Sequence, residues 1–293
     1  MTSPEHLNGG IAKLAAGETV FASFSPADPG NAQAFAPGPY DVVVFEMEHN
    51  PFSTRELRDS LQYLLDRQQI LQRGNVSPAV TPMVRVPANG SEMSQWLAKQ
   101  VLDAGVYGVV FPHVSTVDEA RNAVSACRYP RPESAPNYDP PGVRGDGPFG
   151  AARYWGVDVA EYYRRADTWP LAPGGDILAV IMCEEVKAIR NLPAMLEQVP
   201  GIGLVLIGEG DLCQDLGHPR EYDHPDVEAA IRDVVEICKG VGVPAGIPHV
   251  TAGNVVARLE QGFRWLMPNP ARTNQAVEIG QKWLAENRSG ASA

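Results

Sequence analysis

The sequence is poor in cysteine and has no long hydrophobic segment. It holds four cysteines: Cys127, Cys183, Cys213 and Cys238. None of them forms the CxxC spacing of a zinc or redox motif, and isolated cysteines are typical of a reducing compartment. Residues 1–17 lack the apolar centre of a signal peptide, so we expect a cytoplasmic protein. The longest apolar run, Ile177–Cys183, is too short to cross a bilayer, and no membrane association is expected.

Positive charge is also scarce. The chain has 24 Lys and Arg against 35 Asp and Glu, a formal net charge of −11. An acidic surface repels phosphate backbones, so we expect no nucleic-acid partner. Apolar residues, in contrast, make up 44% of the 293 residues, which is enough for a large core. This length fits one barrel of alternating strands and helices, and we predict a single domain over residues 1–293.

Short apolar runs alternate with longer amphipathic segments along the chain. The runs predict strands buried on both faces: Thr19–Phe24, Val42–Met47, Val80–Val86, Gly108–Pro112, Ile177–Cys183, Leu204–Gly208, Val243–Ile247 and Phe263–Met267. Helices are expected between them: Thr54–Gln69, Glu92–Ala104, Val117–Cys127, Glu185–Gln198, Pro225–Gly240, Gly253–Gln261 and Ala271–Asn287. This alternation favours an α/β fold, a closed (β/α)8 TIM barrel. A doubly wound open sheet is the competing fold, but no GxGxxG turn follows the first run.

One segment interrupts the alternation. Residues 129–175 are rich in proline, glycine and aromatic residues. A loop this long inside a compact domain is usually functional or disordered, and the aromatic content argues against disorder. We therefore predict an ordered excursion, whose role the sequence leaves open.

In such a barrel the active site lies at the carboxyl ends of the strands. His49 follows the second run and suits a proton-transferring base, although a structural histidine is the alternative. Arg85 ends the third run. A buried arginine needs a partner, which is either an internal ion pair or an anionic or carbonyl substrate. His113 and His249 also end strands, and we expect them to support the site.

Carboxylates follow two neighbouring runs. Glu184 and Glu185 come after the fifth run, and Asp211 comes after the sixth. Two carboxylates facing one mouth raise each other's pKa unless a cation neutralises them, and an all-oxygen site suits Mg²⁺ or Mn²⁺. The alternative is that they cap helices, which is the role expected for Glu185. Gly208 and Gly210 lie in a tight turn that we expect to open a helix, and the N–H groups of this turn can hold a substrate carboxylate.

Taken in order, these motifs resemble the HpcH/HpaI aldolase family of metal-dependent class II pyruvate aldolases, which is related to citrate lyase β chains and macrophomate synthase. The matching segments are Phe45–Asn50, Pro82–Pro87, Leu102–Gly105, Gly108–Pro112, Gly142–Gly145, Ile181–Glu184, Leu206–Leu212 and Leu216–Pro219. The resemblance runs from about Gly17 to Pro270. It implies a (β/α)8 barrel and a homo-oligomer, built from dimers that exchange the C-terminal helix and often form a trimer of dimers. This chain departs from the family's G-P-x-D-L-S turn by having Glu209 in place of proline.

The resemblance also implies the roles of individual residues. Glu184 and Asp211 correspond to the ligands of a divalent metal, Mg²⁺ or Mn²⁺ first and Co²⁺ as a further option. Arg85 corresponds to the arginine that binds the oxo acid. His49, oriented by Asp103, would move protons, whereas the sequence alone also allows Asp103 to be a simple cap.

Three further residues have implied roles around this core. Backbone amides near Gly210 would hold the substrate carboxylate. Glu48 and His113 are expected to support the metal and its water from behind the ligands.

The implied activity is the cleavage or formation of 4-hydroxy-2-oxo acids, through a pyruvate enolate and an aldehyde. In the cleavage direction His49 is the base expected to remove the proton of the C4 hydroxyl. Oxaloacetate decarboxylation, or decarboxylative carbon–carbon bond formation, is the alternative reaction through the same enolate. An acyl-CoA lyase would need a basic groove, which the net charge of −11 does not favour. A non-catalytic metabolite-binding barrel is disfavoured, because Arg85, His49, Glu184 and Asp211 are all present.

Overall fold

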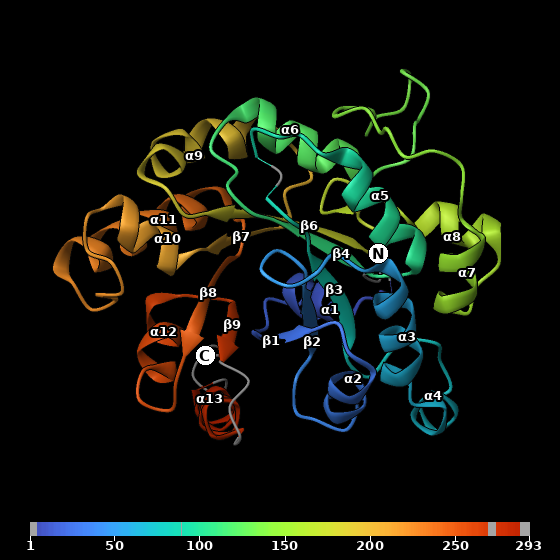
Figure 1. Cartoon of the computed structure of the whole chain (residues 1–293), viewed down its shortest axis with the longest axis horizontal. Coiled ribbons are helices and arrows are strands. Elements are labelled where there is room, and N and C mark those ends of the chain that lie inside the picture. Colours follow the sequence, from blue (N-terminus) through green and yellow to red (C-terminus); the bar gives the residue numbers. More distant parts are fainter. Residues whose placement is uncertain (1–4, 89, 269–273, 288–293) are drawn as a thin grey trace.

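A closed barrel of parallel strands forms the centre of the molecule (Figure 1). The computed structural model describes residues 5–88, 90–268 and 274–287. The strands follow one another in the order of the chain and close by pairing of β4 with β6. The eight barrel strands are β1 (Val20–Pro26), β2 (Val42–Glu46), β3 (Thr81–Arg85), β4 (Gly108–Phe111), β6 (Ile177–Cys183), β7 (Leu204–Ile207), β8 (Ala245–Val250) and β9 (Trp265–Pro268). The predicted (β/α)8 barrel is confirmed, and the open sheet is excluded.

The strands are apolar throughout because both of their faces are buried. In β2, Val42 and Val44 point into the barrel, where they join Met83, Leu178 and Val180 in an inner cluster. The alternate residues of β2, Val43 and Phe45, belong to the cluster between the strands and the surrounding helices. Side chains of neighbouring residues in a strand point to opposite faces, so a strand with two buried faces has no polar positions to alternate.

The helices cover the outside of this barrel (Figure 1). Those that the sequence predicted are α3 (Thr54–Leu64), α4 (Arg67–Arg73), α5 (Gln95–Ala104), α6 (Val117–Ala126), α9 (Val186–Gln198), α11 (Pro225–Val241), α12 (Val255–Gln261) and α13 (Gln275–Asn287). Four short helices were not predicted: α1 (Gly9–Ala15), α2 (Pro29–Phe35), α7 (Phe149–Trp155) and α8 (Val159–Arg165). A fifth short helix, α10 (Glu209–Asp215), begins at the tight turn that was predicted to open a helix. Of the helices in the described ranges, none is both long enough and apolar enough to span a membrane.

Two predicted helix boundaries were wrong for local reasons. The single helix expected over Thr54–Gln69 is two helices, because Asp66 is extended and its carboxylate accepts the N–H groups of Gln68 and Gln69 as a new N-cap. The helix expected from Glu92 begins at Gln95, because Met93 has a left-handed backbone (φ 48°) that a right-handed helix cannot include. The predicted start of the last helix, at residues 271–273, lies outside the described residues.

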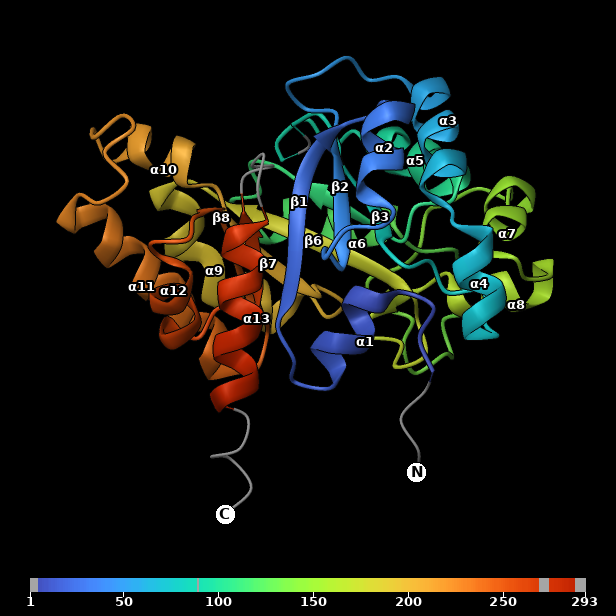
Figure 2. The same ribbon diagram turned by 90° about the horizontal axis from the view of Figure 1, so that it is seen from below.

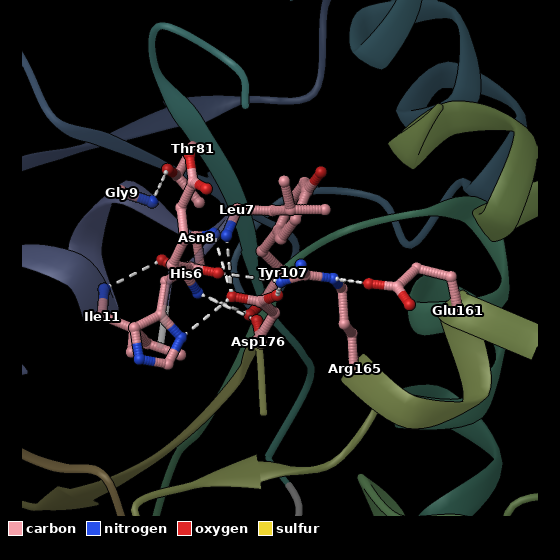
Figure 3. A network of polar contacts seen from close by, with 11 residues as sticks. His6, Leu7, Asn8, Gly9, Ile11, Thr81, Tyr107, Glu161, Arg165 and Asp176 are labelled. Carbon is pink, nitrogen blue, oxygen red and sulfur yellow. Dashed lines mark hydrogen bonds and ion pairs between the residues drawn. The ribbon is translucent and has the colours of Figure 1, made fainter. Parts of the chain in front are cut away.

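The N-terminal segment closes the amino end of the barrel (Figures 2 and 3). Ile11 and Leu14 of α1 belong to the inner cluster, so this helix acts as a plug. The buried carboxylate of Asp176, just before β6, accepts the backbone N–H groups of Leu7 (3.0 Å) and Asn8 (3.2 Å). The same carboxylate pairs with Arg165 at 2.9 Å. These contacts hold the plug in place.

The predicted excursion at residues 129–175 is ordered and lies at this same end. It contains α7, α8 and a two-residue strand, β5 (Thr168–Trp169), that pairs with the start of β6. The segment is held by ion pairs of the Asp167 carboxylate, which lies 2.6 Å from Nε of the buried Arg128 and 2.7 Å from Nη2 of Arg131. The segment connects the end of α6 to the start of β6, so it extends the base of the barrel and not the mouth.

The C-terminal helix α13 packs on its own chain in this structure. It lies beside β1 in Figure 2, and Gly280 sits directly against the ring of Phe21. A Cβ at position 280 would come within 2.6 Å of that ring, so the close approach requires glycine. The exchange of this helix between subunits stays a prediction.

Candidate active site

A cavity of about 360 Å³ opens at the carboxyl ends of the strands. Its walls come from seven of the eight barrel strands or from the loops that follow them. The lining residues are Phe24, His49, Arg85, Met182, Glu184, Gly208, Glu209, Gly210, Asp211, Gln214, Arg220, Tyr222, Pro248, His249, Met267 and Pro268. The cavity therefore lies where the sequence placed the active site.

Arg85 is fixed by two carboxylates at the end of β3. Its guanidinium forms an ion pair with Glu46 in the neighbouring β2, with Nε donating to Oε2 at 2.5 Å. Nη1 lies 3.0 Å from Glu48, and the guanidinium carbon stands 4.5 Å above the ring of Phe24. The internal ion pair predicted as one alternative for Arg85 is confirmed, and the side chain also lines the cavity. Its contact with a substrate stays a prediction.

Glu184 is a buried carboxylate whose negative charge has few stabilising contacts. Its side chain is 2% exposed, and Oε1 accepts the backbone N–H of His113 at 2.5 Å. Burial raises the pKa of Glu184 to about 7, against the lowering effect of that hydrogen bond and of the His113 ring. The negative charges of Glu48 and Asp211 contribute to this raised pKa. A cation beside Glu184 and Asp211 would relieve this repulsion, so the donor set fits a divalent metal.

Glu185 differs from its neighbour in both exposure and contacts. Its side chain is 35% exposed and accepts the hydroxyl of Ser115 at 2.8 Å. Glu185 does occupy the N-cap position of α9, as predicted, but its carboxylate makes no capping hydrogen bond. Instead, Asp215 accepts the N–H of Val186 at 2.7 Å. The candidate metal ligand after β6 is therefore Glu184.

His113 is enclosed by carboxylates. Nδ1 lies 3.6 Å from Glu184 and 3.4 Å from Glu185, and Nε2 lies 3.8 Å from Glu48. Burial lowers the pKa of His113, but the surrounding carboxylates raise it by more, so that the net pKa is above its ordinary value. His113 and Glu48 thus adjoin the candidate metal ligand, where the supporting role was predicted.

His49 and Asp103 are not brought together within one chain. The His49 ring is 67% exposed at the mouth and lies 3.5 Å from Glu48. Asp103 is near the end of α5, at the opposite end of the barrel, where it binds Arg144 of the excursion at 2.8 Å. The predicted orientation of His49 by Asp103 is therefore not met in this chain, because α5 runs antiparallel to the strands and carries Asp103 away from the mouth.

The glycine turn is only partly free to bind substrate. The N–H of Gly208 donates to the carbonyl of Cys183 at 3.1 Å, so it is not available to a carboxylate. Gly208 instead allows a close approach of Glu184, whose Oε2 would be 2.1 Å from a Cβ at that position. Gly210 lies in the first turn of α10 and lines the cavity.

Sequence reasoning missed one wall of the cavity. Glu209, Arg220 and Tyr222 line it together with His249. The sequence offered one clue to this wall, which is the acidic residue Glu209 inside the glycine turn. Its contact, His249, is 40 positions away in the chain, so the sequence does not indicate the pair. Arg220 and His249 both have left-handed backbones, with φ of 66° and 53°. Such conformations are costly for residues other than glycine and gather at functional sites.

A separate polar cluster lies outside the cavity lining. His218, His224 and Asp226 place one ligand atom each within 4.8 Å of one another, near the start of α11. The two rings are stacked, with centroids 3.4 Å apart. We assign no function to this cluster.

The pKa of Glu184 predicts how metal affinity depends on pH. Below about pH 7 the folded protein holds a proton that a cation must displace. We expect the affinity for Mn²⁺ to fall by roughly tenfold per pH unit below that point and to level off above it. Calorimetric titration from pH 5.5 to 8.5, in two buffers with different ionisation enthalpies, measures the affinity and the released proton. An affinity that does not change with pH would contradict the assignment, and Glu185→Gln is the matched control.

The stability of the metal-free protein should fall as the pH rises, whereas its affinity for the metal should increase. The pKa of Glu184 is higher in the folded state than its ordinary value of 4.5. Its contribution to the free energy of unfolding is therefore present below pH 4.5 and is lost as the pH rises through about 7. Bound metal removes this loss, so the rise in melting temperature on adding Mn²⁺ should be larger at pH 8 than at pH 6.

The fold and the cavity together define a class of protein. A (β/α)8 barrel that gathers two carboxylates and an arginine at the carboxyl ends of its strands is an enzyme scaffold for small anionic substrates and a divalent cation. The comparisons with known proteins identify the family.

The model of the HpcH/HpaI aldolase/citrate lyase family matches residues 22–263, and the chain belongs to this family. A hydroxypyruvate/pyruvate aldolase of Roseobacter denitrificans is 29% identical over 96% of this chain and 98% of its own length. A pyruvate aldolase of Rhizobium etli is 34% identical over 75% of this chain and 74% of its own. A solved family member from Burkholderia cenocepacia superposes with a TM-score of 0.73 at 26% identity, over 96% of this chain and 99% of that one. The chain is therefore a carbon–carbon lyase of the metal-dependent aldolase class.

Proposed function

We propose that this aldolase cleaves or forms 4-hydroxy-2-oxo acids, with pyruvate as one partner and an aldehyde as the other. The observation that carries the proposal is the cavity that brings Glu184, Asp211 and Arg85 together at the mouth of the barrel. The names of the relatives, which include pyruvate and hydroxypyruvate aldolases, support the donor.

Glu184 and Asp211 would hold the metal, with Mg²⁺ or Mn²⁺ preferred for an oxygen-only donor set and Co²⁺ as a further option. Such an ion supplies Lewis-acid stabilisation of negative charge on the 2-oxo oxygen. Arg85 lies in the same cavity and adds hydrogen bonds and positive charge at the developing enolate. Glu46 and Glu48 keep its guanidinium in place, with Nη1 of Arg85 3.0 Å from Glu48.

Transfer of the C4-hydroxyl proton falls to His49. Its ring is exposed at the mouth and lies 3.5 Å from Glu48, the carboxylate that also binds Arg85. The His49 ring therefore lies beside Glu48, which in turn holds Arg85, the residue proposed to contact the enolate. Asp103 can orient His49 only if it is contributed by another subunit, because within one chain it binds Arg144.

We further propose that the enzyme is a cytoplasmic homo-oligomer, with a dimer or a trimer of dimers as the expected assembly. The four cysteines, all of which lie in the described residues, are free and buried. This fits a reducing compartment. Small-angle scattering or analytical ultracentrifugation measures the assembly.

Removal of the metal tests the proposed function. We expect exhaustive treatment with EDTA to abolish the cleavage of 4-hydroxy-2-oxopentanoate, measured as pyruvate released to a lactate dehydrogenase assay. Added Mg²⁺, Mn²⁺ or Co²⁺ should restore it, because the ion stabilises the enolate charge. Full activity without metal, or a Schiff base trapped by borohydride, would contradict the proposal. A panel of aldehydes incubated with pyruvate and Mn²⁺, read by mass spectrometry, identifies the acceptor.

A further inference from the structure

The described residues give the cavity an apolar floor beneath its charged walls. Three side chains form this floor, namely Phe24 of β1, Met182 of β6 and Met267 of β9, and all three line the cavity. Met182 and Met267 are each 2% exposed and belong to the inner cluster of the barrel, against which Phe24 packs. The apolar floor is therefore the upper end of the barrel core, and it offers carbon and thioether sulfur to whatever rests on it.

Two side chains of the apolar floor touch the guanidinium of Arg85. Sδ of Met182 lies 3.8 Å from Nη1, and the ring centroid of Phe24 lies 4.5 Å from the guanidinium carbon. The carboxylates of Glu46 and Glu48 hold the same guanidinium. Arg85 thus stands at the border between the apolar floor and the charged wall of the cavity.

The position of Arg85 determines which part of a 2-oxo acid comes close to this border. In the proposed function Arg85 contacts the 2-oxo oxygen, and the candidate metal ligands Glu184 and Asp211 line the same cavity. The atom C2 carries both this oxygen and C3, so C3 is only two bonds from the oxygen that Arg85 contacts. The carboxylate and the 2-oxo oxygen of the donor are drawn to positive charge. This leaves C3 as the part of the donor that suits the apolar side chains around Arg85.

The free energy of placing a substituent of C3 beside these side chains depends on its polarity. A hydrogen or a methyl group on C3 leaves no hydrogen bond unmade against methionine and phenylalanine. A hydroxyl there gives up hydrogen bonds to water, and a thioether sulfur is only a weak acceptor in return. An apolar pocket disfavours an added hydroxyl by up to about a hundredfold. Pyruvate and hydroxypyruvate differ by this one hydroxyl.

We propose that Met182 is a specificity-determining residue of the donor site, which selects 2-oxo acids with hydrogen or an alkyl group at C3 and disfavours those with a hydroxyl. The inference rests on the proposed function, because it takes the 2-oxo oxygen to lie against Arg85. It goes beyond the names of the relatives, which include hydroxypyruvate as well as pyruvate. Met182 acts by its contact with C3, so the metal ligands and His49 keep their proposed roles.

Hydrogen exchange at C3 measures the choice of donor without an acceptor. In D₂O with saturating Mg²⁺ and no aldehyde, a C3 hydrogen leaves as a proton, and a deuteron from the solvent takes its place when the enolate is protonated again. NMR follows this exchange for pyruvate and for hydroxypyruvate, after subtraction of the rate without enzyme. We expect kcat/KM for exchange to favour pyruvate by at least about tenfold. A competition titration of the two donors measures their binding independently of exchange.

Met182→Gln is the decisive variant, since it replaces the thioether by an amide of similar length that both donates and accepts hydrogen bonds. It should shift the ratio of the two kcat/KM values toward hydroxypyruvate by at least about tenfold, mainly through KM. Comparing this ratio between proteins removes the difference in intrinsic acidity between the two donors. Met182→Leu is the matched control, because it conserves volume and apolar character and should keep the wild-type ratio. If Met182→Gln is unstable, Met182→Thr provides a hydroxyl at the same position.

The results separate this inference from the function on which it rests. An unchanged ratio in the polar variant, or an equal shift in Met182→Leu, would overturn the role of Met182, while cleavage of 4-hydroxy-2-oxopentanoate by the wild type would leave the aldolase in place. A wild-type enzyme that exchanges neither donor and cleaves no 4-hydroxy-2-oxo acid would overturn both. A shift confined to the polar variant, with the same Mg²⁺ affinity in all the proteins compared, supports the assignment.

Discussion

Replacing Glu184 by alanine is expected to remove the metal and nearly all of the activity. Glu184 is buried at the end of β6, and this burial raises the pKa of its carboxyl group to about 7, so a nearby cation would stabilise its charged form. A Lewis-acid ion contributes several kcal/mol of charge stabilisation, so its loss predicts a rate reduction on the order of 10³-fold. Asp211→Ala should have a similar effect. Calorimetric Mn²⁺ titration and the pyruvate-release assay measure the two consequences.

Glu185→Ala is the matched control for this experiment. The residue is adjacent in sequence and carries the same charge, but it is 35% exposed and binds Ser115. It should therefore keep the metal and most of the activity. If Glu185→Ala loses the metal while Glu184→Ala keeps it, the assignment of ligands after β6 is wrong by one residue.

Arg85→Lys is expected to depress both aldol cleavage and oxaloacetate decarboxylation. Lysine keeps the positive charge but loses the planar fork that contacts Glu46 and Glu48 together. The lost stabilisation of enolate charge should cost roughly 2–4 kcal/mol in each reaction, the usual size for an oxyanion donor. The measurement is kcat/KM for both reactions at saturating metal.

The effect of Arg85→Lys on folding has to be separated from its effect on catalysis. The variant leaves two buried carboxylates with a poorer partner, so its melting temperature is measured in parallel. Arg232→Lys is the control for replacing an arginine by a lysine outside the cavity, because Arg232 lies on the exposed side of α11. Losses confined to cleavage would show that Arg85 binds the acceptor and not the enolate.

The barrel was predictable because its strands are buried on both faces. Ile177–Cys183 was predicted as a strand from its seven consecutive apolar residues. The structure has a strand with the same bounds, and all seven of its residues are buried. The short helices α1 and α2 were not predicted, because each has only seven residues and little periodicity to detect. The strand ends were also readable, because a closed parallel barrel brings them all to one mouth.

The partners of the site residues were harder to predict than their positions. Arg85 was placed correctly, but its pairing with Glu46 depends on the register between β2 and β3, where these two residues are opposite each other. The contact between Glu209 and His249 spans 40 positions, and nothing in either segment indicates it. Asp103 was assigned by resemblance, and its pairing with Arg144 depends on how the excursion folds.

The plug formed by α1 at the base of the barrel can bind in its place only after the chain has been made as far as Asp176. Leu7 and Asn8 reach Asp176 across 169 and 168 positions of the chain, so a nascent chain that ends after β4 carries the plug without the carboxylate that receives it. Contacts this distant in sequence form slowly, because a long loop must be closed before they are made. Helix α1 is thus made before β6 but seated only after it, and until then Ile11 and Leu14 lack the inner cluster that buries them in the folded chain.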